Sequence, residues 1–130
     1  MIVDSSALMA VIEGEPEAVK LLRAMTESSC RMSLGSWVEC SIVAEARSSA
    51  HGERFDRIVA DLAIERVPVT ERQADVARQA YRRYGKGSGS SATLNLGDCF
   101  AYALSVTEGE PLLCVGRDFA ATDVARVALD

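Results

Sequence analysis

The stretch that decides the fold is residues 94–118, LNLGDCFAYALSVTEGEPLLCVGRD. After Asp98, apolar residues recur at helical spacing and predict a buried helix that ends near Gly109. An apolar run from Leu112 to Val115 then predicts a buried strand. A buried helix that leads directly into an apolar strand is typical of a parallel sheet with both faces covered.

The rest of the chain repeats this alternation. Further strands are predicted at residues 1–3, 30–34, 64–69 and 124–129, and further helices at 5–12, 16–25, 36–51, 55–62 and 70–84. Gly52 is expected to break the long helix after His51, and the segment GKGSGSSAT, residues 85–93, predicts a flexible loop. Strands that alternate with helices predict the α/β class, as a three-layer α/β/α sandwich with a mostly parallel sheet.

Length and composition predict one domain over residues 1–130. Hydrophobic residues make up 48% of the chain and charged residues 25%, which is ordinary for a globular protein. The longest apolar run, Ala7 to Ile12, is far shorter than the roughly 20 residues that cross a bilayer. The N-terminus also lacks the basic-then-apolar order of a signal peptide. We therefore expect a soluble, cytoplasmic protein without a membrane segment.

The cysteine and histidine residues exclude two classes of site. Cys30, Cys40, Cys99 and Cys114 contain no Cys-x-x-Cys pair, and His51 is the only histidine, so no zinc cluster is predicted. The cysteines are expected to be reduced thiols in the core. A single histidine in a polar segment also argues against a catalytic triad.

The net charge of −5 argues against non-specific binding of nucleic acid, so an RNA substrate would need a local reversal of sign. The strongest local basic cluster consists of Arg82, Arg83 and Lys86. These cations could contact RNA phosphates, or they could simply complement the dipole at a solvated helix end. Arg47 could face the acidic site or form an ion pair on the surface. Trp37 could stack on a base, but a tryptophan on a mostly apolar helix more often lies in the core or in an interface.

Four acidic residues fall at helix starts or strand ends. Asp4 ends the first strand, Glu39 falls in the first turn of the helix after the second, Asp98 opens a helix, and Asp118 follows the strand after it. Singly, each has a structural explanation: Asp4 and Asp98 as N-caps, Glu39 in a capping box with Ser36, Asp118 as a turn residue. Jointly, they would converge at the edge where parallel strands end, which is where such folds bind ligands.

Converging carboxylates need a counter-ion, because four anions at close range repel one another. Mg²⁺ prefers oxygen ligands and is usually held by one or two carboxylates, so Asp4 and Asp98 would bind it directly while Glu39 and Asp118 act through water. Such an ion binds a phosphate and lowers the pKa of a coordinated water. The pattern therefore predicts phosphodiester hydrolysis.

Several segments together resemble the PIN-domain toxins of VapBC toxin-antitoxin systems. The resemblance covers nearly the whole chain and rests on the segments IVDSSAL (2–8), SLGSWVECSIVAEAR (33–47), YRRYGKG (81–87), LNLGDCFAYAL (94–104) and EPLLCVGRDFAATDV (110–124). The last two are the most specific, because apolar and acidic residues recur in them in a fixed order and spacing.

The resemblance implies a five-stranded parallel sheet between helices and a ribonuclease that depends on Mg²⁺ or Mn²⁺. It implies that Asp4, Glu39, Asp98 and Asp118 are the catalytic and metal-binding residues, and that the Ser6 hydroxyl helps to orient metal-bound water. It further implies a homodimer and an antitoxin that blocks the site and joins the toxin in binding operator DNA. This chain departs from many similar proteins in the Gly/Ser loop 85–93 and at Arg117, where they often carry an acid.

Two other enzyme classes require motifs at the end of the first strand. A haloacid-dehalogenase-like phosphatase needs Asp-x-Asp after the first strand, where this chain has Asp4-Ser5-Ser6, and a response-regulator receiver needs a paired acid there. Neither pattern is present. The remaining alternative is a non-catalytic module that binds an antitoxin and joins a DNA complex.

Overall fold

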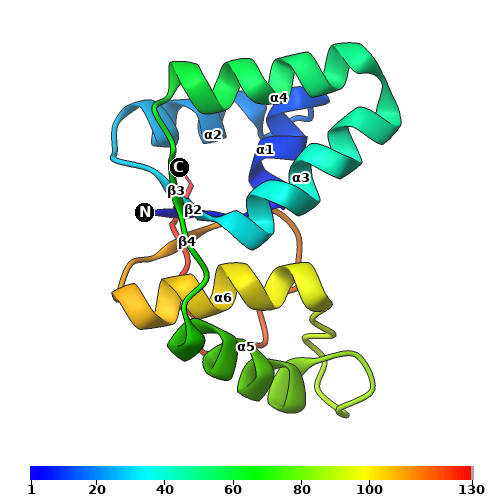
Figure 1. Ribbon diagram of the computed structural model, residues 1–130, viewed down its shortest axis with the longest axis vertical. Coiled ribbons are helices and arrows are strands. Elements are labelled where there is room, and N and C mark those ends of the chain that lie inside the picture. Colours follow the sequence, from blue (N-terminus) through cyan, green and yellow to red (C-terminus); the bar gives the residue numbers. More distant parts are fainter. Residues whose placement is uncertain (130) are drawn as a thin grey trace.

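The computed structural model describes residues 1–129 and has three layers. Figure 1 shows the strands across the middle, with α1 to α4 on one side and α5 and α6 on the other. The strands are β1 (Ile2–Val3), β2 (Arg31–Ser33), β3 (Glu65–Val67) and β4 (Leu112–Leu113). The helices are α1 (Ser5–Ile12), α2 (Ala18–Thr26), α3 (Leu34–Arg47), α4 (Ser49–Asp61), α5 (Glu71–Tyr84) and α6 (Leu96–Glu108). The predicted α/β/α sandwich is confirmed.

The order of the strands explains the layers. The sheet is parallel throughout, in the order β3-β2-β1-β4. The chain steps from β1 to β2 to β3 in one direction, and α1 to α4 make those two crossovers. It then returns past β1 to β4 through α5 and α6. Because such crossovers are right-handed, reversing direction puts the last two helices on the opposite face. The reversal makes the carboxyl ends of β1 and β4 the expected place for a ligand.

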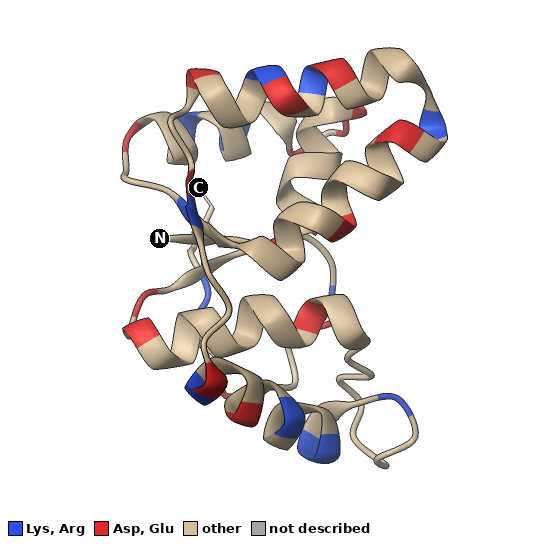
Figure 2. Ribbon diagram, in the orientation of Figure 1, with Lys and Arg blue, Asp and Glu red and all other residues tan. Residues whose placement is uncertain are grey.

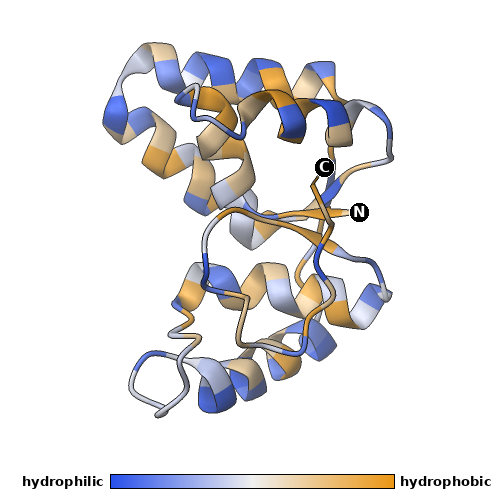
Figure 3. Ribbon diagram, turned by 180° about the vertical axis from the view of Figure 1, so that it is seen from behind, coloured by the Kyte–Doolittle hydropathy of each residue, from blue (hydrophilic) through white to orange (hydrophobic). Residues whose placement is uncertain are grey.

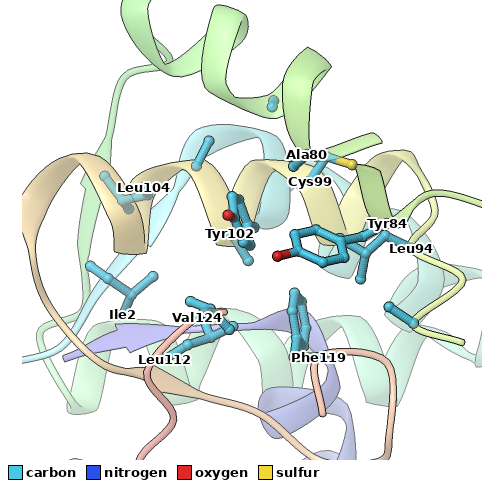
Figure 4. Close-up of a cluster of buried hydrophobic side chains, with 14 of the residues drawn as sticks. Ile2, Ala80, Tyr84, Leu94, Cys99, Tyr102, Leu104, Leu112, Phe119 and Val124 are labelled. Atoms are coloured by element: carbon cyan, nitrogen blue, oxygen red, sulfur yellow. The ribbon is translucent and has the colours of Figure 1, made fainter. Parts of the chain in front are cut away.

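Alternate side chains of the strands divide the interior into two cores. Ile2 and Leu112 pack with α5 and α6, whereas Val3 and Leu113 pack with α1 to α4. In the first core, Figure 4 shows Ile2 and Leu112 on the sheet side, opposite Tyr102 of α6. Viewed from behind in Figure 3, the strands are hydrophobic and the outer faces of the helices largely hydrophilic. Both faces of the sheet are therefore buried, as the sequence predicts.

The helix predicted over residues 36–51 is wrong at both ends. Helix α3 begins at Leu34, because the Ser33 side chain caps it by accepting a hydrogen bond from the Gly35 N–H (3.1 Å). It ends at Arg47, since Ser48 is extended and caps α4 through the His51 N–H (3.0 Å). The break therefore comes at a capping serine. Gly52, the predicted breaker, lies inside α4.

The predicted fifth strand is also wrong for the described chain. Within residues 1–129 the sheet has four strands, and the segment 124–129 contributes only an isolated parallel bridge between Leu112 and Arg126. Two hydrogen bonds hold it, from the Leu112 N–H to the Ala125 carbonyl and from the Val127 N–H to the Leu112 carbonyl. Because β4 itself is only two residues long, it offers little edge for a longer ladder.

The remaining expectations concern the cysteines and the membrane. Cys30, Cys40 and Cys99 are buried and Cys114 is half-buried, and within residues 1–129 none forms a disulfide. The predicted core position is therefore confirmed for Cys30, Cys40 and Cys99. No helix in the described chain is long and apolar enough to cross a bilayer.

The two-sided core makes a stability prediction for α6. Leu104 is completely buried, whereas Val106 on the same helix is 46% exposed. Leu104→Ala should lower the free energy of unfolding by about 2–5 kcal/mol through lost burial and a residual cavity. Val106→Ala should change it by less than about 0.5 kcal/mol. Urea denaturation of both variants tests this, and equal losses would contradict the assignment of α6 to the core.

Candidate metal centre and active site

The four predicted acidic residues line one cleft. Asp4, Glu39, Asp98 and Asp118 all contribute to a cavity of about 260 Å³, together with Ser5, Ser6, Met9, Cys40, Val43 and Asn95. The cleft lies where β1 and β4 end and α1 and α6 begin. Figure 2 shows acidic residues on α3 and at the start of α6, on opposite sides of the sheet edge. The predicted convergence of four carboxylates is therefore what the fold produces.

Asp4 is the most buried of the four acids, at 2% exposed. Its Oδ2 atom accepts a hydrogen bond from the Ser6 N–H (3.1 Å), so it caps α1 as predicted. Its Oδ1 atom is buried and has no hydrogen-bond partner among residues 1–129. Burial raises the pKa of Asp4 to about 7, and the charges of Asp98 and Glu39 add to the rise. Hydrogen bonds from Ser6 act in the opposite direction and lower it. One oxygen is thus left for a ligand from outside the chain.

Asp98 lies in the first turn of α6 and is not its N-cap as predicted, because the helix begins at Leu96 and Asn95 caps it. Its Oδ2 atom accepts from the Asn95 N–H (3.0 Å), while the Asn95 Oδ1 atom accepts from the Asp98 N–H (2.9 Å), which makes a reciprocal capping box at the start of α6. Burial raises the pKa of Asp98 to about 6, partly offset by the bond from Asn95, and the nearby charges of Asp118 and Glu39 contribute to the rise. The cap therefore fixes the carboxylate that faces the cleft.

Glu39 enters the cleft from the second turn of α3, not the first, because α3 begins at Leu34. The capping box that sequence suggested for Ser36 is absent from the described chain, since the Ser36 Oγ atom is buried without a partner. The Ser5 hydroxyl instead donates to Glu39 Oε1 (2.7 Å). On the other side, a Cβ atom at Gly97 would overlap the Glu39 carboxylate. Ser5 and the bare backbone of Gly97 thus define where this carboxylate lies.

Asp118 and Ser6 lie at the β4 side of the cleft. Asp118 is exposed and follows the segment Gly116-Arg117, in which Arg117 is also exposed. The Ser6 Oγ atom accepts a hydrogen bond from the Val115 N–H (3.0 Å), so it joins the first turn of α1 to the chain beyond β4. Ser6 therefore lines the cleft and also holds its two walls together.

The predicted basic and aromatic candidates lie elsewhere. Arg83 stacks over the Tyr84 ring (4.9 Å) and lies 3.7 Å from Asp123, and Arg82 is exposed on the same helix. Lys86 lines a separate groove, described below. Arg47 pairs with Glu13 on the surface. The Trp37 ring packs at a tilt against the Phe55 ring, with centroids 6.3 Å apart, and Arg66 lies over Trp37. Neither Arg47 nor Trp37 contributes to the acidic cleft.

Comparison with known proteins gives the family. The PIN domain family matches residues 1–125. Ribonuclease VapC30 of Mycobacterium tuberculosis is 45% identical over 131 residues, which covers 99% of each chain. The chain belongs to the PIN-domain VapC ribonuclease family.

Solved structures of PIN-domain toxins have the same fold. VapC20 of Mycobacterium tuberculosis, titled a sarcin-ricin loop cleaving toxin, matches with a TM-score of 0.74 at 17% identity and covers 97% of each chain. VapBC2 from Rickettsia felis, bound to a DNA fragment from its promoter, matches with a TM-score of 0.73 at 9% identity and covers 99% of this chain and 98% of that one. At these identities the likeness concerns the fold.

The donor set of this VapC-family cleft suits a hard divalent cation. The charged residues that line it are all carboxylates, and Asp4 among them has a buried Oδ1 atom without a partner in the described chain. A cation would offset the repulsion among these like charges. In the described chain, no three Asp, Glu, His or Cys side chains are arranged to ligate one ion by themselves. Mg²⁺ does not need three, since it usually retains several waters and takes one or two carboxylates.

Sequence reasoning missed two residues of the VapC-family site. Ser5 carries no motif of its own, and its position directly after Asp4 at the start of a helix was the available signal. Asn95 lies three residues before Asp98, the spacing of a capping box, which was the signal for its role. Both act on an acidic side chain already identified.

Burial of Asp4 makes a prediction for the metal-free protein. Because the folded pKa lies near 7, above the ordinary 3.8, folding favours the protonated carboxyl. The associated stability is complete below about pH 4 and is lost as pH rises through about 7. In EDTA at pH 8, Asp4→Asn should therefore raise Tm by about 3 °C or more, while asparagine still caps α1.

The control is Asp61→Asn, which removes an exposed carboxylate outside the cleft. It should leave Tm and its pH dependence unchanged in a thermal scan from pH 4 to pH 9. A lower Tm for Asp4→Asn at pH 8 would contradict the destabilising burial.

Proposed function

We propose that this protein is the toxin of a type II toxin-antitoxin system, an endoribonuclease that uses Mg²⁺, with Mn²⁺ able to substitute. The observation that carries the proposal is a cleft lined by four carboxylates, one of which, Asp4, has a buried Oδ1 atom without a partner within residues 1–129. The membership of the VapC ribonuclease family supports the reaction class. We further propose that residues 1–130 act as one PIN domain.

Each acidic residue has a proposed role that follows from its contacts. Asp4 and Asp98 hold the cation directly, since they are the two buried carboxylates. Glu39, held by Ser5, and the exposed Asp118 bind water at the periphery of the site, and Ser6 helps to orient such water. When bound, the cation neutralises phosphate charge and lowers the pKa of a coordinated water. Glu39, Asp118 and Ser6 would orient water beside an RNA phosphodiester bond that lies in the cleft.

The proposed partners follow from the relatives. One structurally similar protein is bound to its promoter DNA in a VapBC complex, and another comes from a toxin-antitoxin complex of Klebsiella pneumoniae. We propose that an antitoxin protein covers this cleft, that operator DNA is bound only through that complex, and that the toxin is a homodimer. Because the proposed substrate is cellular RNA, we also propose that the protein acts in the cytoplasm.

The activity is tested with purified, antitoxin-free protein and total cellular RNA. Discrete cuts, mapped by sequencing of the ends, should require Mg²⁺ or Mn²⁺ and disappear with EDTA. Asp98→Asn should reduce the rate at least 100-fold, because the amide keeps an oxygen for the Asn95 N–H but loses the charge. Asp61→Asn, an exposed charge-matched control, should cut normally. Intact RNA despite a folded, metal-binding wild type would indicate the non-catalytic binding module instead.

Gly97 provides a test that leaves the acidic residues in place. Gly97→Ala should favour the helix by up to about 1 kcal/mol, yet its Cβ atom must displace the Glu39 carboxylate. We expect cleavage to fall about 10-fold or more without loss of Tm. Gly52→Ala on α4 is the matched control, since the nearest atoms to its Cβ would belong to the flexible Glu45 side chain of α3, outside the cleft. Normal cleavage by Gly97→Ala would remove Glu39 from the proposed site.

A further inference from the structure

A second groove lies beside the acidic cleft and shares only Asn95 with it. It has a volume of about 560 Å³ and runs between α5 and α6. Its floor is apolar and includes Ala77 and Cys99, and its rim carries Arg78 and Lys86. Asn95 lines both this groove and the acidic cleft, so the two cavities share a wall. A molecule lying in the groove would therefore reach the carboxylates past Asn95.

The charge of this region is opposite to that of the protein. The net charge is −5, but the 22 residues between Asp75 and Asp98 contain no acidic residue and four cations, Arg78, Arg82, Arg83 and Lys86. Figure 2 shows this basic region on the C-terminal half of α5 and the following loop. Arg83 is turned toward Asp123, whereas Arg78 and Lys86 line the groove. The local reversal of sign suits the phosphates of a polyanion.

An exposed aromatic ring is fixed in the same groove. Tyr81 is 45% exposed, and a Cβ atom at Gly85 would meet both the ring and the backbone carbonyl of Tyr81. The ring therefore packs against the bare backbone of Gly85, which limits its movement. A held, exposed ring flanked by cations is the arrangement with which proteins stack an unpaired base and bind the neighbouring phosphates. Unstacked bases of single-stranded RNA present such faces.

We propose that the α5–α6 groove is a nucleobase subsite for single-stranded RNA, in which Tyr81 stacks on a base and Arg78 and Lys86 hold the adjoining phosphates. The inference rests on the proposed ribonuclease function, since it assigns the subsite to the substrate of the acidic cleft. The shared wall at Asn95 places that base close to the phosphodiester bond that enters the cleft. Binding there orients the RNA and selects an unpaired position next to the cut.

Binding is measured in the Asp98→Asn background, so that no RNA is consumed. The probe is a fluorescein-labelled single-stranded RNA of about 12 nucleotides that spans a mapped cut, or has mixed sequence if the wild type cuts none. Adding Tyr81→Ala should weaken the anisotropy-derived Kd about 10-fold, whereas Tyr81→Phe should retain it, because the ring is what stacks. Lys86→Gln should reduce the slope of log K against log salt by about 0.7, and Arg57→Gln on α4 should not.

A set of RNAs, each with one abasic nucleotide, locates the stacked base. One abasic position should weaken binding about 10-fold to the protein with Tyr81 and have no effect on the protein with Tyr81→Ala, while other positions act equally on both. Tyr81-dependent binding without cleavage by the wild type would end the proposed nuclease and keep the subsite. Metal-dependent cleavage with unchanged binding by Tyr81→Ala and Lys86→Gln would overturn the subsite. A change in sedimentation of Tyr81→Ala with unchanged RNA affinity would also overturn it, because a second copy of the chain would then occupy the groove.

Discussion

The site depends on the burial of one carboxylate at the end of the central strand. Asp4 follows β1, which lies between β2 and β4, so the chain on either side of it is enclosed by the sheet and α1. The helix N-terminus and the Ser6 N–H stabilise one oxygen, while the other has no partner within the described residues. Burial without full compensation costs stability, and proteins retain such a cost mainly at functional sites. The other acids line the same cavity, and the charges of Asp98 and Glu39 act on Asp4, which increases the need for a cation.

The sequence was sufficient to predict the architecture and the acidic cluster. Apolar runs that alternate with helical patterns require a covered parallel sheet, and strand ends in such a sheet must meet at one edge. Asp4 was identified correctly as the N-cap of α1. The N-cap predicted at Asp98 is wrong, because Asn95 caps α6 and Asp98 completes the capping box three residues later. Glu39 was placed in the right cleft although its helix begins two residues earlier than predicted. An error of two residues shifts the start of a helix but does not change the edge of the sheet at which that helix begins.

The features that sequence could not supply depend on contacts between distant segments. Ser48 ends α3 because its side chain caps a second helix. Such a cap competes with continuing the helix through His51, and sequence alone does not decide between them. The terminal segment fails as a strand because its partner β4 is short. Among the basic residues, Arg83 faces Asp123, and Arg78, which carried no signal, lines the groove. Helical spacing shows which residues share a face but not which neighbouring helix covers it.

The central claim is that a divalent cation binds the free oxygen of Asp4. Anomalous diffraction from crystals soaked in Mn²⁺ tests it most directly, with Asp4→Asn crystals as the control. The account predicts a Mn²⁺ peak in the acidic cleft, in contact with Asp4 Oδ1 and with Asp98, that is absent from the variant. A bound Mn²⁺ elsewhere with an empty cleft, or an unchanged peak in Asp4→Asn, would contradict it.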